Sequence, residues 1–110
     1  MSKFIYNNIL VYATDKDILT TDCIYVLEIV DKNGIIHPYV GQTHYMKERL
    51  MNHLYHHDRY IKAELIKECQ YLKLHIITKE ENYNKRRKIE SEYIKRFRKI
   101  YKSKLINVYD

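Results

Sequence analysis

The chain has 110 residues and a mass of 13.5 kDa, which limits it to one domain with a single core. Hydrophobic residues make up 45% and charged residues 31% of the sequence, a balance that excludes a disordered chain. Lys and Arg outnumber Asp and Glu by 20 to 14. A net charge of +6 on so small a domain favours a polyanionic partner such as nucleic acid over a basic surface without a partner.

Two cysteines, Cys23 and Cys69, are too few for a disulfide framework, and their spacing does not suit a metal site. We therefore expect reduced thiols and a cytoplasmic protein. No apolar run approaches the roughly 18 residues that a membrane helix requires, and residues 1–10 lack the pattern of a secretion signal. These features predict a soluble protein without a membrane partner.

Residues 1–22 are predicted to form an extension that packs on the main domain of residues 23–110. The apolar residues of this extension fit either a short helix or an outer strand, and residues 15–22 have the composition of a loop.

The main domain begins with a predicted hairpin. The apolar, β-branched run from residue 23 to residue 30 predicts a strand, and Asn33-Gly34 is typical of a tight hairpin turn. Residues 35–40 then return as a second strand. Pro38 lies inside that strand and cannot donate a ladder hydrogen bond, so it indicates an edge position or a bulge.

Helical spacing of Met46, Leu50 and Leu54 predicts a helix over residues 45–56. A second helix is expected to follow, with Asp58 as its N-cap. The remaining predicted elements are a third strand over residues 71–78 and a long charged helix over residues 80–101. The order β-β-α-α-β-α predicts a small α/β (α+β) domain, in which a three-stranded, mainly antiparallel sheet is flanked by helices.

Several residues that suit a catalytic or binding site lie on these predicted elements. Tyr25 and Tyr39 lie on neighbouring strands of the hairpin, and the register decides whether they share a face. Gly41 leaves the backbone open to close approach. Arg49 and His53 are four residues apart and share one helix face.

Cleavage of a phosphodiester requires groups of these kinds. A tyrosine can orient water, and the planar guanidinium of Arg49 matches phosphate oxygens. Glu90 is an oxygen ligand suited to a hard cation such as Mg²⁺. His53 can contact phosphate or move protons. The set therefore favours phosphodiester chemistry.

The same residues carry a resemblance to a known family. Cys23-Ile24-Tyr25 and Tyr39-Val40-Gly41 resemble the two short strand motifs that give the GIY-YIG nucleases their name. The stretch 41–53 resembles the glycine, threonine, arginine and histidine pattern that follows them. Residues 89–97 resemble the helix with the metal-binding glutamate, and Asn107 fits the asparagine that closes the domain.

The resemblance covers residues 22–108 and implies a DNA endonuclease that uses a single Mg²⁺ or Mn²⁺ ion. Tyr25, Tyr39, Arg49, His53, Glu90 and Asn107 would be its catalytic residues, and Glu90 its metal ligand. Glu92 is a second candidate for that glutamate, but Glu90 shares a helix face with Ile94 and is preferred. One departure is Cys23, which stands where the first motif has glycine. The single-domain size favours a phage or mobile-element role, and cleavage of both DNA strands would require a homodimer or two encounters.

Basic residues crowd the C-terminal helix and are expected to follow the DNA backbone. We predict substrate contacts from Gly41, Thr43, Lys47, Arg86 and Arg87. No helix-turn-helix or zinc-finger pattern is present to read sequence.

Three alternatives stay open. His53, His56 and His57 are close enough in sequence to share a zinc ion, although no cysteine is suitably spaced. The same fold could grip nucleic acid with feeble or absent cleavage. A basic protein-binding domain would bind DNA no better than its charge allows.

Overall fold

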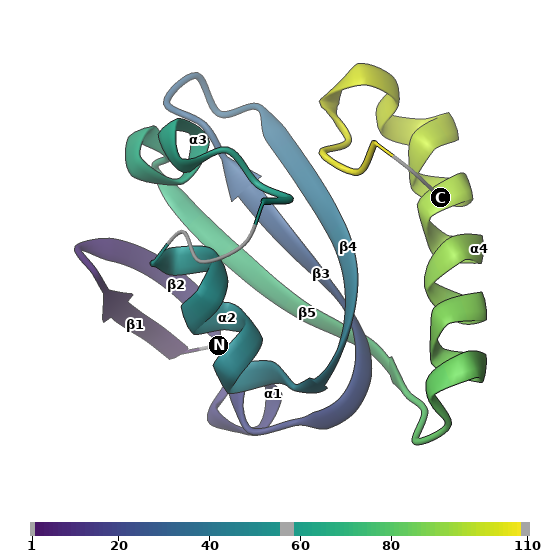
Figure 1. The fold of residues 1–110 in the computed structure, drawn as a ribbon. Helices are drawn as coiled ribbons and strands as arrows, with labels where there is room; N and C mark the ends of the chain where they lie inside the picture. Colours follow the sequence, from purple (N-terminus) through teal and green to yellow (C-terminus); the bar gives the residue numbers. More distant parts are fainter. Residues whose placement is uncertain (1, 56–58, 109–110) are drawn as a thin grey trace.

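The computed structural model describes residues 2–55 and 59–108. Its centre is a five-stranded mixed sheet with helices on both faces, and its strands lie in the order β1-β2-β5-β3-β4 (Figure 1). The strands are β1 (Ser2–Tyr6), β2 (Ile9–Ala13), β3 (Thr21–Val30), β4 (Ile36–Tyr45) and β5 (Tyr71–Lys79). The β2–β5 pair is parallel and the other pairs are antiparallel. The α+β class is therefore confirmed.

The predicted hairpin is present as β3 and β4. The Asp31 carboxylate accepts hydrogen bonds from the backbone N–H groups of Asn33 and Ile35, and Gly34 has the positive φ of 81° that such a turn requires. Strand β4 is an edge strand of the sheet, which explains how it accommodates Pro38. The irregularity in the sheet lies elsewhere, between β3 and β5 beside Tyr25.

The prediction of three strands is wrong, because residues 1–22 contribute two more. Strands β1 and β2 form a hairpin whose two-residue turn is Asn7-Asn8, with φ of 50° and 64°. Asparagine tolerates this left-handed conformation, which a tight hairpin turn needs at both central positions. Because β2 then pairs with β5, this segment is an integral part of the sheet rather than an extension packed on it. The observed order is β-β-α-β-β-α-α-β-α.

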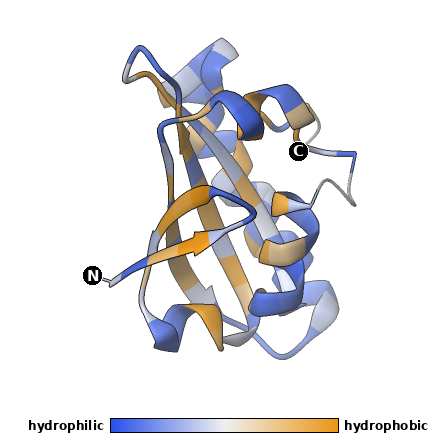
Figure 2. Ribbon diagram, turned by 90° about the vertical axis from the view of Figure 1, so that its left-hand side faces the viewer, coloured by the Kyte–Doolittle hydropathy of each residue, from blue (hydrophilic) through white to orange (hydrophobic). Residues whose placement is uncertain are grey.

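The helices divide unequally between the two faces of the sheet. Helices α1 (Asp15–Ile18), α2 (Met46–Leu54) and α3 (Ala63–Glu68) supply buried side chains to the core on one face, together with Tyr25 and Leu27. Helix α4 (Tyr83–Tyr101), followed by the short helix η1 (Lys102–Lys104), packs on the other face against Ile24, Val26 and Val40. Figure 1 shows α4 across the sheet from α2, and Figure 2 shows apolar residues along the strands between them.

Two boundaries differ from the prediction in ways that matter for the site. Strand β4 continues to Tyr45 instead of ending near residue 40, and α2 follows it without a loop. Helix α4 begins at Tyr83, and the side chain of Asn82 caps it by accepting a 3.0 Å hydrogen bond from the Lys85 N–H. The proposed N-cap Asp58 lies outside the described residues. Within the described part of the chain, no helix is both long enough and apolar enough to cross a membrane.

Candidate functional site

A pocket of about 730 Å³ lies at the exposed edge of strand β4. Five of the residues predicted from the sequence to act in the site line it, and they come from four parts of the chain. They are Tyr39, Arg49, Arg87, Glu90 and Asn107. The remaining lining residues are Gln42, Arg59, Tyr60, Tyr83, Ile94, Ile106 and Val108.

The two predicted strand tyrosines do share a face of the sheet. Tyr25 lies opposite Gly41 in the antiparallel ladder, and Tyr39 lies two residues earlier on β4, so both point toward α2. Their ring centroids are 6.3 Å apart. Tyr39 lines the pocket, whereas Tyr25 is fully buried behind it.

Buried contacts hold Tyr25 firmly in place. Its hydroxyl lies 2.7 Å from Nε2 of His53, which is itself buried on α2. A Cβ atom at position 41 would overlap the Tyr25 phenol ring, so only glycine leaves room for it. The group that approaches Gly41 closely in the structure is the Tyr25 ring of the neighbouring strand.

Helix α2 places Arg49 at the pocket and His53 in the core. The apolar residues Met46, Leu50 and Leu54 bury one stripe of this helix. His53 lies at the end of that stripe, with its ring centroid 5.3 Å from that of Tyr39. Arg49 is half-buried and lines the pocket.

Glu90 enters the pocket from α4, on the other side of β4. Burial raises the pKa of its carboxyl group, against the opposing effects of Arg87, Arg49 and a hydrogen bond from the backbone of Gln42. The carboxylate form of Glu90 is therefore poorly solvated, although the charges of Arg87 and Arg49 favour it. Glu92 is exposed and does not line the pocket, so the structure brings Glu90 and not Glu92 to the site.

The edge position of β4 allows these groups to meet. Arg49 belongs to a helix on one face of the sheet and Glu90 to a helix on the other face. A central strand with neighbours on both sides would separate them by the thickness of the sheet. Because β4 is the last strand of the described sheet, no further strand separates them, and the charge of Arg49 lowers the pKa of Glu90 against the effect of burial.

Asn107 closes part of that edge. Its side-chain amide donates to the Val40 carbonyl and accepts from the Val40 N–H, both at 2.8 Å. The Ile106 N–H donates to the carbonyl of Pro38 at 2.9 Å. The segment thus takes the place of a neighbouring strand over residues 38–40. Asn107 forms one wall of the pocket through these bonds.

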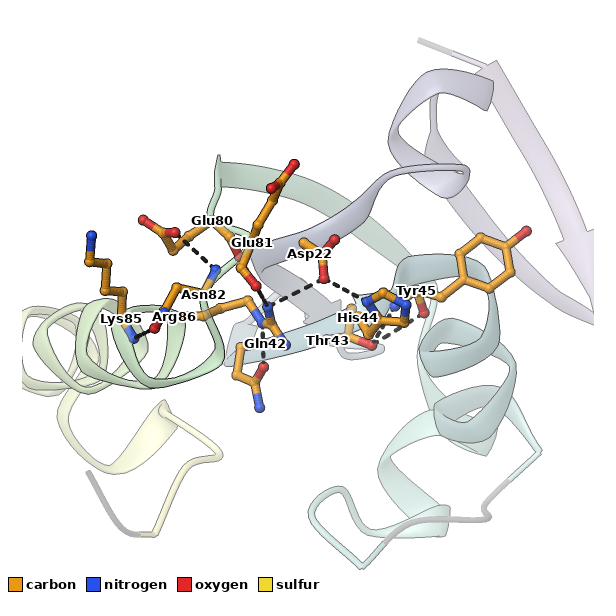
Figure 3. Close-up of polar contacts among 10 residues, drawn as sticks. All are labelled: Asp22, Gln42, Thr43, His44, Tyr45, Glu80, Glu81, Asn82, Lys85 and Arg86. Atoms are coloured by element: carbon orange, nitrogen blue, oxygen red, sulfur yellow. Dashed lines mark hydrogen bonds and ion pairs between the residues drawn. The ribbon is translucent and has the colours of Figure 1, made fainter.

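Arg86 is not where the sequence led us to expect it. It is 5% exposed, and its guanidinium donates to Gln42 Oε1 at 2.7 Å and to the carbonyl of Glu80 at 3.0 Å. Asp22 accepts a further, longer bond and also contacts His44 (Figure 3). These bonds tie the first turn of α4 to β3 and β4, so Arg86 is engaged inside the structure and not presented to a substrate.

The other predicted contact residues differ in their placement. Arg87 faces the pocket, one residue after the engaged Arg86. Thr43 is buried, and its hydroxyl contacts the backbone of Tyr45. Lys47 is exposed on α2 outside the pocket lining.

Of the seven lining residues that were not predicted from the sequence, Arg59, Tyr60 and Tyr83 carry charged or aromatic side chains. Arg59 and Tyr60 follow α2 in a segment without regular structure, and no sequence pattern marked them. Tyr83 occupies the first turn of α4. The sequence feature that could have marked Tyr83 is its position next to the N-cap of a basic helix.

No cluster of three or more His, Cys, Asp or Glu side chains with metal-binding geometry occurs within residues 2–55 and 59–108. His56 and His57, from the zinc alternative, lie outside these residues. The carboxylate of Glu90 alone fits a different kind of site, because Mg²⁺ is commonly held by one or two carboxylates together with water and substrate phosphates.

Comparisons of this chain with models of protein families, with curated proteins and with solved structures find no match.

Proposed function

We propose that this protein is a metal-dependent DNA endonuclease of the GIY-YIG type that hydrolyses phosphodiester bonds. The observation that carries the proposal is the convergence of Tyr39, Arg49 and Glu90 on one pocket from three different elements. These are the residue types that phosphodiester hydrolysis needs: a group that orients water, a cation and a metal-binding carboxylate.

In this proposal the scissile phosphate enters the pocket beside Arg49 and Arg87. Each guanidinium can donate two parallel hydrogen bonds to phosphate oxygens, and both stabilise the negative charge that develops during attack. Glu90 would hold one Mg²⁺ or Mn²⁺ ion, which supplies Lewis-acid stabilisation to the reacting phosphate when it is bound.

Tyr39 is the phenol that we assign to the attacking water, because it lines the pocket while Tyr25 lies behind it. Tyr25 and His53 then serve as positioning residues. Their 2.7 Å contact fixes the imidazole whose ring packs against the Tyr39 ring. Asn107 positions the edge strand that carries Tyr39.

The net charge of +6 supports DNA as the partner. One such pocket cuts one strand, so scission of a duplex requires a homodimer or a second encounter. The proposal also includes that the protein acts in the cytoplasm.

Conversion of supercoiled plasmid to the nicked form in Mg²⁺ tests the proposal. We expect nicking by the wild-type protein and a loss of at least about 100-fold in Glu90→Gln and Arg49→Ala. Glu92→Gln is the matched control, since it removes an exposed carboxylate from the same helix and should retain activity. Tyr39→Phe should lose more activity than Tyr25→Phe.

Two outcomes would contradict the proposal. Nicking that persists in both Glu90→Gln and Arg49→Ala would show that the activity comes from elsewhere. Tight binding of DNA by a folded wild-type protein that never nicks it would favour the alternative, a nucleic-acid-binding module on the same fold.

A further inference from the structure

The pocket has an aromatic rim that phosphodiester hydrolysis does not require. Tyr60 is 63% exposed and Tyr83 is 53% exposed, and both line the pocket. They reach it from the two sides of β4, because Tyr60 precedes α3 on one face of the sheet and Tyr83 opens α4 on the other. Neither position was singled out by the strand and helix motifs.

Each ring is also oriented by its neighbours. The Tyr60 ring lies 6.2 Å from that of Tyr39, with 30° between the ring planes. The guanidinium carbons of Arg86 and Arg87 lie 5.6 and 5.8 Å from the centre of the Tyr83 ring, at the distance of cation–π contacts. The rings therefore project into the pocket from defined surroundings.

A single exposed tyrosine needs no explanation, since many surface residues are apolar. Two exposed rings on one basic pocket form the combination that proteins use for unpaired nucleotides: aromatic platforms for the bases and arginines for the backbone. The arginines that line this pocket are Arg49, Arg59 and Arg87. The volume of about 730 Å³ also falls within the roughly 300–1,000 Å³ range of ligand pockets.

We infer that this pocket binds an unpaired nucleotide, and that the preferred DNA substrate is single-stranded or locally unpaired at the cleavage position. Bases inside a continuous duplex are stacked on each other and cannot reach the rings unless they are extruded, which costs a few kcal/mol. A strand that is already unpaired avoids this cost. The inference rests on the proposed nuclease function and adds the structure of its substrate.

Binding without cleavage provides the first test. Fluorescence anisotropy in EDTA measures the Kd for a short single-stranded oligonucleotide and for a duplex of the same sequence. We expect Tyr60→Ala and Tyr83→Ala each to weaken single-strand binding about fivefold or more, and the phenylalanine variants to restore it, because stacking needs the ring and not the hydroxyl. Circular dichroism establishes that each variant is folded.

Tyr55→Ala is the matched control, because Tyr55 is a 45% exposed tyrosine that does not line the pocket. Its affinity for single strands should equal that of the wild type. If the Tyr60 and Tyr83 variants also equal the wild type, the stacking role is wrong. If they weaken duplex and single-strand binding by the same factor, the rings serve general DNA contact and the inference is likewise wrong.

Cleavage separates this inference from the function on which it rests. Two duplexes of identical length, one continuous and one with a central unpaired stretch, are incubated with protein and Mg²⁺. Preferred cutting of the unpaired stretch, reduced by Tyr60→Ala and Tyr83→Ala, supports the inference. Equal cutting of both duplexes overturns it but leaves the nuclease in place. Cutting of neither duplex overturns the nuclease, and the binding measurement in EDTA then decides whether the pocket takes an unpaired nucleotide.

Discussion

Strand β4 separates two halves of the candidate site that are stabilised in opposite ways. On the α2 face, Tyr25, Gly41 and His53 form a buried, closely packed unit with a 2.7 Å contact between the phenol and the imidazole. On the α4 face, Glu90 stays half-buried, and burial raises its pKa against the effect of two nearby arginines. One half is held by a buried contact between a phenol and an imidazole, whereas the other retains a carboxylate whose charge is poorly solvated.

This difference fits a division of tasks within the proposed enzyme. Groups that hold a geometry benefit from dense packing, because a displaced side chain would have to leave a filled core. A group that receives a cation has to keep an open position, and part of its interaction energy stays unused until the ion and the substrate arrive. Substitution of Glu90 should therefore have the opposite effect on stability to substitution of the residues that hold the geometry of the site.

The largest expected effect comes from the tether that holds the α4 half in place. Arg86→Met removes the guanidinium that bonds Gln42 and Asp22 and should lower the free energy of unfolding by about 3 kcal/mol. Arg87→Met is the matched control: it alters the neighbouring arginine, which faces the pocket, and should change stability by about 0.5 kcal/mol or less. Urea denaturation measures both, and equal losses would show that Arg86 is not a specific tether.

A somewhat smaller loss is expected on the α2 side. Gly41→Ala forces a Cβ atom into the Tyr25 ring and should cost about 2 kcal/mol of stability. The clash disappears when the ring is truncated, so the cost of Gly41→Ala should fall clearly in a Tyr25→Ala background. A double-mutant cycle by urea denaturation measures this coupling. Strictly additive losses would mean that the two residues do not constrain each other.

The smallest effect has the opposite sign and concerns Glu90. Because its folded-state pKa is raised by burial, its contribution to stability is complete below the ordinary pKa of glutamic acid and is lost as the pH rises through the raised value. Glu90→Gln carries no such loss. Its free energy of unfolding relative to wild type should therefore rise between about pH 4 and neutrality.

Urea denaturation over this pH range, without divalent cations, gives the measurement. Glu92→Gln removes an exposed carboxylate from the same helix and reports the effect of net charge alone. If Glu90→Gln is less stable than wild type at neutral pH, the carboxylate stabilises the fold and the contrast between the two halves fails.

Prediction from the sequence succeeded for the fold where local signals were strong. The Asn33-Gly34 turn, the helical spacing of Met46, Leu50 and Leu54, and the long α4 pattern each correspond to an observed element. For residues 1–22 it left a short helix and an outer strand open, and the outer strand is present as β1, paired to β2 through the unrecognised Asn7-Asn8 turn. The prediction of a loop over residues 15–22 is wrong, because α1 occupies Asp15–Ile18 and β3 begins at Thr21. The pairing of β2 with β5 joins residues about 60 positions apart, and no local pattern carries such information.

The candidate site shows a similar division. The residue types and helix positions of Arg49 and Glu90 were visible in the sequence, and both line the pocket. Arg86 and Arg87 looked equivalent, yet one is engaged within the structure and the other faces the pocket. Adjacent helix positions point about 100° apart, so the packing of α4 against β4 separates the two roles.

The sequence by itself determined which chemical groups the chain carries and on which helix or strand face they lie, because side-chain periodicity is a property of the local backbone. Only the tertiary structure decided which of them meet. Strand β4 became an edge strand through the pairing of β3 with β5, and this left Tyr39, Arg49 and Glu90 on one open side. The rim formed by Tyr60 and Tyr83 depends on the same arrangement, since it joins segments that only the folded sheet brings together.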